Sequence, residues 1–420
     1  MTSTSSNSRI PVIIDTDPGV DDIIAILFAI ASPELDILAF NVTYGNTDLD
    51  SSYLNILKVY RAIELHLELH PSDKYRFPNF NSGRKPILVR GSHAPLQGEV
   101  HGAQYFHGRD GLGNIAGRHP ELAYTKPGPD HPQLTISDQT GVDVALDILK
   151  SYPPRSVSYI VLGPMTNLAL MMRKDSKTVR DRIGRVICMG GALDVPGNTS
   201  PVAEFNFYAD PFAVKELLIS TPLHEGLPLD RFTLVSLDIS TTHELPFVVY
   251  KKAVDGAFEN TKAPSVCGTK SPITHFTSSF LERTREVMLQ FGKDVMELHD
   301  IVAVWCAIDH PPFPENESPK AAPGWKGNFR VFDIERTGEL TRGMLVVDRR
   351  EDESAYELGA NRSEAQKEKD DLEHNAKLAE QQKSHIKGST VTGIHVISET
   401  PGSQVLLEKL LNRVWNASIP

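Results

Sequence analysis

Short runs of apolar residues alternate with segments of helical spacing through most of this 420-residue chain. The apolar runs have the length of strands but lack the alternation of a half-exposed strand, so they predict strands buried on both faces. Buried strands separated by helices favour right-handed crossovers and parallel pairing. We therefore expect an α/β fold with an open, mostly parallel, twisted sheet flanked by helices. The predicted strands are residues 10–14, 36–44, 86–90, 157–162, 185–191 and 233–238.

The segments between these strands predict helices by their periodicity. Residues 23–30 are apolar on every side, which indicates a buried helix. Thr166 or Asn167 is a natural cap for the helix that starts near Leu168. The predicted helices are residues 23–30, 54–69, 142–149, 168–172, 212–218, 279–290, 301–308 and 404–414.

Several segments show neither the helical nor the strand periodicity. Residues 70–84, 119–138 and 263–278 are polar or proline-rich, and we expect surface loops there. Residues 101–114 are glycine-rich, but their spacing fits neither a P-loop nor a dinucleotide fingerprint. A loop or flap at the rim of a binding site is the better interpretation of that segment.

The last part of the chain predicts an added layer. Residues 330–334 and 344–348 indicate a late β-hairpin, which residues 391–397 could extend. Residues 351–388 are rich in charged and amide side chains and poor in apolar ones, so we expect a disordered or solvated insertion. With a disordered start at residues 1–9, the pattern predicts a single catalytic domain over residues 10–420.

The composition of the chain indicates its cellular compartment and the class of molecule that it binds. The chain is 40% hydrophobic and 23% charged, and its net charge of −11 argues against a nucleic-acid backbone or an anionic membrane as a partner. Cys188, Cys267 and Cys306 show neither pairing nor metal-ligand spacing, so each is expected as a buried small hydrophobe in a reducing compartment. No signal peptide or membrane span is visible. We expect a cytoplasmic protein, with access to the nucleus left open.

The strongest chemical signal lies between the first strand and the first helix. Asp15, Asp17, Asp21 and Asp22 fall within eight residues, and Pro18-Gly19 interrupts both periodicities. Like charges so close together repel, and at the carboxyl edge of a buried strand they need compensation. Ca²⁺ supplies it, because this ion takes roughly six to eight oxygen ligands in proteins.

Two other interpretations of these acids stay open. A single Asp at a strand–helix junction usually caps the helix, and Asp15 is the member most suited to a structural role, holding backbone N–H groups of the loop. A D-x-D turn after a strand also occurs in phosphohydrolases of the haloacid-dehalogenase type. In that case Asp15 would be the nucleophile and Asp17 the acid, with Mg²⁺; the Pro18-Gly19 pair and the lack of an obvious phosphate-gripping lysine argue against it.

Further polar blocks follow the later strands in a fixed order. Together with D-T-D-P-G-V-D-D, this ordered set resembles the inosine-uridine-preferring nucleoside hydrolase family over residues 10–348 and again from Thr392. The resemblance implies an open, Rossmann-like fold and hydrolysis of the N-glycosidic bond of a ribonucleoside to ribose and free base. The blocks are Gly45-Asn46, His107-Gly108, Gly111-Leu112, residues 162–167, residues 189–191, Asn198, Glu204-Phe205-Asn206 and His299-Asp300.

The resemblance also implies a Ca²⁺ site. Its ligands would be Asp17, Asp22, Asp300 and the backbone carbonyl of Leu162, with ribose hydroxyls completing the shell. The residue chemistry agrees, since carboxylates, a carbonyl and water suit Ca²⁺ better than zinc, which prefers His or Cys. Asp17 is implied as the general base that takes a proton from the attacking water.

The same resemblance implies the contacts to the sugar. Asp21 would accept from the 2′-hydroxyl, Asn46 and Asn206 would lie near the reacting carbon and the 3′-hydroxyl, and Phe205 would pack under the ring. The remaining expected substrate contacts are Asn198 and Glu204, to the 5′-hydroxyl, and His107. Taken alone, Asn198 fits a turn better than a sugar contact, and the nearby Glu204 and Asn206 reverse that interpretation. His107 fits a loop-stabilising hydrogen bond equally well.

His299 matches the residue that protonates the leaving base of pyrimidines and inosine, and its titration range suits a general acid; a helix cap is the alternative. None of Trp305, Trp325 and Trp415 is placed for the tryptophan sandwich of the purine-specific branch. The chain therefore resembles the uridine- and inosine-preferring branch, such as a uridine nucleosidase. Residues 263–275 fall where the base-covering segment lies, so the preferred base stays open.

Three rivals remain at this point: the phosphohydrolase above, a non-catalytic homologue that binds nucleoside and Ca²⁺, and a phosphorolytic enzyme. Thr47-Asp48 departs from the Gln-Thr pair that usually follows Gly-Asn in the family, and we expect this difference to alter the rim of the pocket.

The expected partner is a small ribonucleoside, and the resemblance implies a homo-oligomer, a dimer or tetramer.

Overall fold

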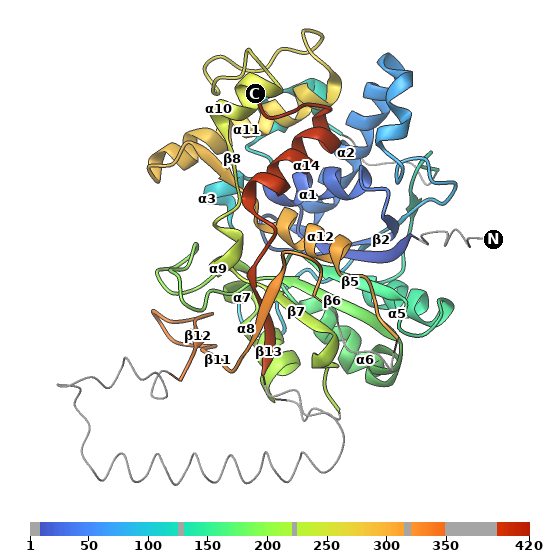
Figure 1. The fold of residues 1–420 in the computed structure, drawn as a ribbon, viewed down its shortest axis with the longest axis vertical. Helices are drawn as coiled ribbons and strands as arrows, with labels where there is room; N and C mark the ends of the chain where they lie inside the picture. Colours follow the sequence, from blue (N-terminus) through green and yellow to red (C-terminus); the bar gives the residue numbers. More distant parts are fainter. Residues whose placement is uncertain (1–8, 125–129, 221–224, 315–320, 349–392) are drawn as a thin grey trace, which may run out of the picture.

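The computed structural model describes residues 9–124, 130–220, 225–314, 321–348 and 393–420 (Figure 1). Among these residues, nine strands form one sheet in the order β10-β13-β7-β6-β5-β1-β2-β3-β4. Only β10 runs antiparallel to its neighbour within this described sheet, so the predicted mostly parallel α/β fold is confirmed. The strands are β1 Ile10–Thr16, β2 Leu35–Val42, β3 Ile87–Arg90, β4 Thr135–Ile136, β5 Val157–Val161, β6 Ile183–Met189, β7 Phe232–Val235, β10 Lys326–Arg330 and β13 Ile394–Glu399.

Helices cover both faces of the sheet, which explains why its central strands are apolar throughout (Figure 1). α1, the predicted helix without a polar face, is buried between the sheet and its neighbouring helices. The helices on the α1 face are α1 Val20–Ile30, α2 Leu49–Leu69, α11 Pro272–Gln290, α12 His299–Asp309 and α14 Ser403–Trp415. Those on the opposite face are α5 Gly141–Ser151, α6 Thr166–Arg182 and α8 Pro211–Lys215.

Shorter elements lie at the edges of this core. Two antiparallel pairs stand apart from the main sheet, β8 with β9 and β11 with β12. The remaining short elements discussed below are α3 Gln104–His107, α4 Ile115–Arg118, α7 Phe205–Ala209, β8 Glu244–Pro246, β9 Val295–Glu297, β11 Asp333–Ile334 and β12 Leu345–Val346.

The strand order reverses at β1. The chain passes from β1 to β2 on one side, and β5 later pairs with β1 on the other side. In open α/β sheets, such a reversal leaves a crevice outside the carboxyl ends of the strands. Asp17, Asn46 and Leu162 follow β1, β2 and β5 at this edge, so the topology gathers the predicted site.

The segment 70–84 is more than a surface loop. It contains a 3₁₀ helix, Pro71–Arg76, and Phe77 and Phe80 are buried. Asn79 anchors it, because its amide nitrogen donates to the carbonyls of Ala29 and Ser32 at 3.1 and 2.8 Å. The prediction of a plain surface insertion was wrong here, because polar composition hid three buried side chains.

The prediction for residues 263–290 placed the helix start too late. α11 begins at Pro272, and Ser271 caps it by accepting from the amide of Thr274 at 3.2 Å. The first turns of α11 hold several Ser and Thr residues, which are weak helix formers, and this composition resembled a loop. The Ser-Pro pair was a usable start signal.

The late hairpin exists in part. β11 and β12 pair antiparallel, as predicted, but over two residues each. β13 does not extend that hairpin: it pairs with β10 and β7 in the main sheet. Of the segments expected to be disordered, 1–9 and 351–388, residues 1–8 and 351–388 lie outside the described residues.

Two of the three cysteines, Cys188 and Cys306, are buried as expected, whereas Cys267 is exposed, so the prediction for that residue was wrong. Among the described residues, no helix combines the length and apolar character needed to cross a bilayer.

Candidate active site

A cavity of about 550 Å³ opens at the carboxyl ends of β1, β2, β5 and β6. Its lining brings together side chains that are distant in sequence. Asp17 and Asp22 are fully buried and are not among the lining residues. The predicted site residues in the wall are Asp21, Asn46, His107, Leu162, Asn198, Glu204, Phe205, Asn206, His299 and Asp300.

Asp17 is enclosed by backbone. Its Oδ2 accepts from the amide of Asn46 at 2.8 Å, whereas its Oδ1 is buried and has no hydrogen-bond partner. A Cβ atom at Gly45 would come within 2.0 Å of Oδ2, and one at Gly163 within 2.5 Å of Oδ1. These two glycines therefore allow the strand ends of β2 and β5 to close around the carboxylate.

Asp22 ties the elements of the site together. Its oxygens accept from Thr16 Oγ1 at 2.5 Å, from the Gly19 amide at 3.0 Å and from Asn46 Nδ2 at 2.8 Å. Through these bonds the end of β1, the start of α1 and the turn after β2 share one carboxylate. The same bonds fix the amide side chain of Asn46 at the edge of the cavity.

Asp300 joins this group from the other end of the sequence. It lies in the first turn of α12, which packs against α1. Carboxylate oxygens of Asp21, Asp22 and Asp300 lie within 4.8 Å of one another, close enough to share one cation. The compact trio thus contains Asp21, whereas the sequence analysis assigned its place to Asp17.

The carboxylates of the site are poorly neutralised by protein groups. Burial raises the pKa of Asp17 and of Asp300 well above the ordinary value, and the charges of the neighbouring aspartates raise both further. Burial, and then the charge of Asp22, raise the pKa of Asp21 to about 7. Among the described residues, no Lys or Arg forms an ion pair with Asp17, Asp21, Asp22 or Asp300. Charge balance calls for protons or a bound cation.

The donor set fits Ca²⁺. It consists of oxygen atoms, and Oδ1 of Asp17 and Oδ1 of Asp21 are buried without hydrogen-bond partners. The carbonyl of Leu162 accepts from Asn206 Nδ2 at 2.6 Å, which uses one of its two lone pairs. The residues present therefore suit a hard divalent cation.

Asp15, two residues before Asp17, is fully committed to internal bonds. It accepts from Tyr159 OH at 2.6 Å and from Asn167 Nδ2 at 2.9 Å. Burial raises its pKa to about 7, against the effect of these two bonds. Asp15 holds side chains rather than the loop amides that we expected. Asn167 and Thr166 do not cap α6 either, because Thr166 donates to Asp210.

Glu204 and Asn198 shape the wall opposite Asp17 by binding backbone. The Glu204 carboxylate accepts from the amides of Gly191, Asn206 and Phe207 at 2.8, 2.8 and 3.0 Å, and it caps α7. Asn198 Oδ1 accepts from the amide of Phe205 at 2.9 Å. Both side chains also line the cavity, so their backbone bonds orient them there.

Two histidines face the cavity with different partners. His107 Nδ1 accepts from the amide of Val20 at 3.1 Å, and burial lowers its pKa to about 3, so it is neutral. His299 Nδ1 lies 2.8 Å from Ser240 Oγ, and its Nε2 lies 3.3 Å from Glu297. Burial alone would lower the pKa of His299, but the carboxylates of Glu297, Asp21 and Glu204 together outweigh burial and the net pKa is raised.

The apolar lining of the cavity and the side chains that contact His299 were not predicted from the sequence. Tyr105 and Phe106 come from the glycine-rich segment, and Met288 and Phe291 come from the end of α11. Tyr105 is 55% exposed and Phe291 64% exposed. The available signal was the pair of aromatic residues, Tyr105 and Phe106, in a glycine-rich segment that was expected as a loop at the rim. Of the described residues that line the cavity, none is a tryptophan.

Comparison with known proteins identifies the family. The sequence profile described as inosine-uridine preferring nucleoside hydrolase matches residues 12–383, and the chain belongs to this family. An uncharacterised protein of Schizosaccharomyces pombe is 31% identical over 338 residues, which cover 80% of this chain and 88% of that protein. The inosine-uridine preferring nucleoside hydrolase of Leishmania major is 30% identical over 342 residues, covering 80% and 87%.

A bacterial relative and two solved structures extend the comparison. The pyrimidine-specific ribonucleoside hydrolase RihA of Salmonella arizonae is 32% identical over 349 residues, covering 81% of this chain and 88% of that protein. An inosine-guanosine nucleoside hydrolase superposes with a TM-score of 0.63 at 22% identity, covering 97% and 98%. A purine-preferring ribonucleoside hydrolase from Gardnerella vaginalis superposes with a TM-score of 0.62 at 21% identity, covering 97% and 98%. These likenesses show the shared fold.

Proposed function

We propose that this protein hydrolyses the N-glycosidic bond of ribonucleosides of the uridine and inosine type, producing ribose and a free base. One observation carries the proposal: Asp17, Asp21 and Asp22, near the start of the chain, and the distant Asp300 gather beside a cavity of about 550 Å³, without an ion pair to Lys or Arg among the described residues. Family membership supports the reaction class.

We assign the Ca²⁺ ligands to Asp17, Asp22, Asp300 and the carbonyl of Leu162, with Asp21 beside them. When bound, Ca²⁺ would lower the pKa of a water molecule and hold ribose hydroxyls. Asp17 acts as the general base and accepts the proton of the attacking water at Oδ1, the oxygen without a hydrogen-bond partner. Asn46 holds the other oxygen of Asp17, which fixes the direction in which Oδ1 points.

The side chains of the wall position the sugar. Asp21 accepts from the 2′-hydroxyl, and Asn46 and Asn206 bind near the reacting carbon and the 3′-hydroxyl. Asn198 and Glu204 bind the 5′-hydroxyl, and both are oriented by backbone amides. His107 closes this side of the pocket, and Phe205 packs under the ring, which develops oxocarbenium character as the base departs.

His299 is proposed to donate a proton to the leaving base. The pKa of His299 is raised above the ordinary histidine value, which favours the protonated imidazole that an acid needs. Ser240 holds Nδ1, which leaves Nε2 to exchange its long contact with Glu297 for the base. Relatives at or above 30% identity carry inosine-uridine and pyrimidine names, which supports uridine and inosine as substrates over a specificity for purine nucleosides alone.

The phosphohydrolase alternative finds no support in the geometry. A nucleophilic Asp15 would need a free carboxylate oxygen, yet both of its oxygens accept hydrogen bonds, from Tyr159 and from Asn167. The non-catalytic alternative, a homologue that binds nucleoside and Ca²⁺, would use the same carboxylates as ligands, so it is distinguished from the proposed hydrolase by turnover alone.

Product analysis tests the proposal. The purified full chain with Ca²⁺ should release ribose and base from uridine and inosine without added phosphate. Phosphate release from a phosphomonoester would support the phosphohydrolase, and ribose 1-phosphate formed only with added phosphate would support phosphorolysis. Tight uridine binding without turnover would indicate a binding protein and would overturn the proposed activity.

A further inference from the structure

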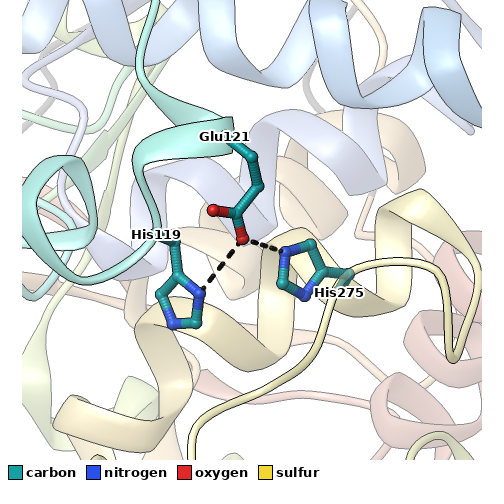
Figure 2. Close-up of side chains that lie close together, drawn as sticks. All are labelled: His119, Glu121 and His275. Carbon is teal, nitrogen blue, oxygen red and sulfur yellow. Dashed lines mark hydrogen bonds and ion pairs between the residues drawn. The ribbon is translucent and has the colours of Figure 1, made fainter.

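A second group of metal-ligating side chains lies outside the cavity, where the segment after α4 meets α11 (Figure 2). His119 precedes a 3₁₀ turn, Pro120–Leu122, which contains Glu121, and His275 lies in the first turns of α11. One nitrogen of each histidine and one carboxylate oxygen lie within 4.8 Å of one another. None of the three side chains takes part in the proposed hydrolysis.

The three ligand atoms already converge. Oε1 of Glu121 lies 2.9 Å from Nε2 of His275 and 3.4 Å from Nδ1 of His119 (Figure 2). The two imidazole rings are nearly perpendicular, at 78°, so they approach this oxygen from different directions. Ligand atoms around a tetrahedral ion with bonds of about 2.0–2.1 Å are roughly 3.3 Å apart. An ion therefore fits here with small shifts of the side chains.

In both histidines, the ring nitrogen that faces away from Glu121 also has a polar partner. Nδ1 of His275 lies 2.9 Å from Ser265 Oγ, and Nε2 of His119 lies 3.5 Å from Oε2 of the buried Glu282. Arg118 lies 2.9 Å from Glu282 and 3.4 Å from His119 Nε2. Partners of this kind, on the nitrogen that faces away from the ion, are typical of metal-binding histidines.

The position of His119 between two carboxylates suits a bound ion, and Arg118, 3.4 Å from Nε2, makes a metal-free hydrogen-bonded cluster the alternative that the test must separate. A neutral imidazole has one N–H, yet each of its ring nitrogens faces a glutamate, Glu121 on one side and Glu282 on the other. A cation bound at Nδ1 would leave the N–H on Nε2, where Glu282 can accept it. It would also balance the charge of Glu121.

We propose that His119, Glu121 and His275 bind a divalent transition-metal ion of the Zn²⁺ class. Two imidazoles and one carboxylate suit zinc, whereas Ca²⁺ prefers oxygen ligands. The histidine side chains are 3% exposed and that of Glu121 is 40% exposed, and Glu121 and His275 line a cavity of about 640 Å³. Water from that side can fill the open coordination position.

Such an ion would fasten two segments that shape the candidate active site. α4 and His119 follow the glycine-rich segment that carries His107, and α11 ends in Met288 and Phe291 of the cavity wall. The ion would stabilise this junction because it binds the folded chain preferentially. The inference does not depend on the proposed hydrolysis.

The test is a Zn²⁺ titration of the metal-free full chain, in excess Ca²⁺ and in competition with a chromophoric chelator. The wild type should bind one Zn²⁺ per chain with a rise in melting temperature. Glu121→Gln and His275→Asn should each weaken binding at least about 10-fold, and Ser265→Ala, which removes only an outer partner, by about 10-fold. His93→Ala, at an exposed histidine elsewhere, is the matched control and should bind like the wild type.

If His275→Asn fails to fold, the visible absorption of the Co²⁺-loaded chain decides. The wild type should show the spectrum of a nitrogen-ligated ion, and Glu121→Gln, altered at a partly exposed side chain, should lose or change it. Absence of Zn²⁺ binding in the wild type would overturn the proposal. Binding of equal strength in Glu121→Gln and His275→Asn would overturn it as well, and would leave a hydrogen-bonded cluster only.

Discussion

The floor and the rim of the candidate active site are built in opposite ways. At the floor, Asp17 and Asp22 are fully buried and are positioned by backbone amides and by Asn46. At the rim, Tyr105 and Phe291 are more than half exposed and contribute apolar surface from a short helix and a helix end. Under the proposed function, the floor would determine which bond is broken, whereas the rim would determine which base is accepted.

A second contrast lies within the floor itself. Asp15 and Asp17 are two residues apart, yet Asp15 has both oxygens hydrogen-bonded to side chains and Asp17 has one oxygen without a partner. Hydrogen bonding thus separates a structural carboxylate from one available for chemistry. The predictions below test these two contrasts.

Replacing the available carboxylate should have the largest effect. Asp17→Asn removes the proposed base and an anionic ligand, so kcat for ribose release from uridine should fall on the order of 10³–10⁴-fold. The calcium-free variant should melt at a higher temperature than the calcium-free wild type, because one buried negative charge is gone. A steady-state assay measures kcat, and thermal melting compares the two calcium-free proteins. A kcat within a factor of ten of the wild-type value would exclude Asp17 as the base.

Loss of the proposed acid should cost less. His299→Asn should lower kcat for uridine and inosine by about 10²-fold. A substrate with a strongly activated leaving group, such as a nitrophenyl riboside, should be nearly unaffected, because its departure needs no proton. Comparison of the two kcat values is the measurement, and equal losses on both substrates would assign His299 a structural role.

Replacing Asp15, the structural carboxylate, should lower the stability of the protein and leave kcat largely unchanged. Asp15→Asn, the matched control for Asp17→Asn, keeps the shape of the side chain but disturbs the bonds to Tyr159 and Asn167. We expect the free energy of unfolding to fall by about 1–3 kcal/mol. Denaturant titration and kcat of the folded protein check this. A loss of kcat as large as that of Asp17→Asn would revive Asp15 as a catalytic group.

A substitution at the rim should have the smallest effect on the kinetics, and the size of that effect should depend on the base of the substrate. Phe291→Ala removes an exposed ring, worth roughly 1 kcal/mol or less of binding free energy. KM should rise several-fold for one base more than for another, with kcat little changed. Leu289→Ala, at an exposed position that does not line the cavity, is the control. Equal KM changes for uridine, cytidine, inosine and adenosine would show that this side chain does not select the base.

The sequence predicts the floor better than the rim for a physical reason. The four aspartates and Pro18-Gly19 are adjacent along the chain, so their crowding is visible locally. The partners of Asp15 come from β5 and α6, and Glu121 is 154 residues from His275. Such pairs are created only by the crossovers of the fold. For the same reason the sequence permits β13 as an extension of the late hairpin, since local pattern does not reveal strand order.

The most direct test of the central claim is calcium removal and return. The chain is stripped with a chelator, and calorimetric Ca²⁺ titration is run beside an assay of ribose release from uridine. We expect one Ca²⁺ per chain, loss of activity in the stripped protein and recovery that follows calcium occupancy, with no binding of similar affinity in Asp22→Asn. Full ribose release by the stripped chain, or calcium binding unchanged in Asp22→Asn, would contradict the account.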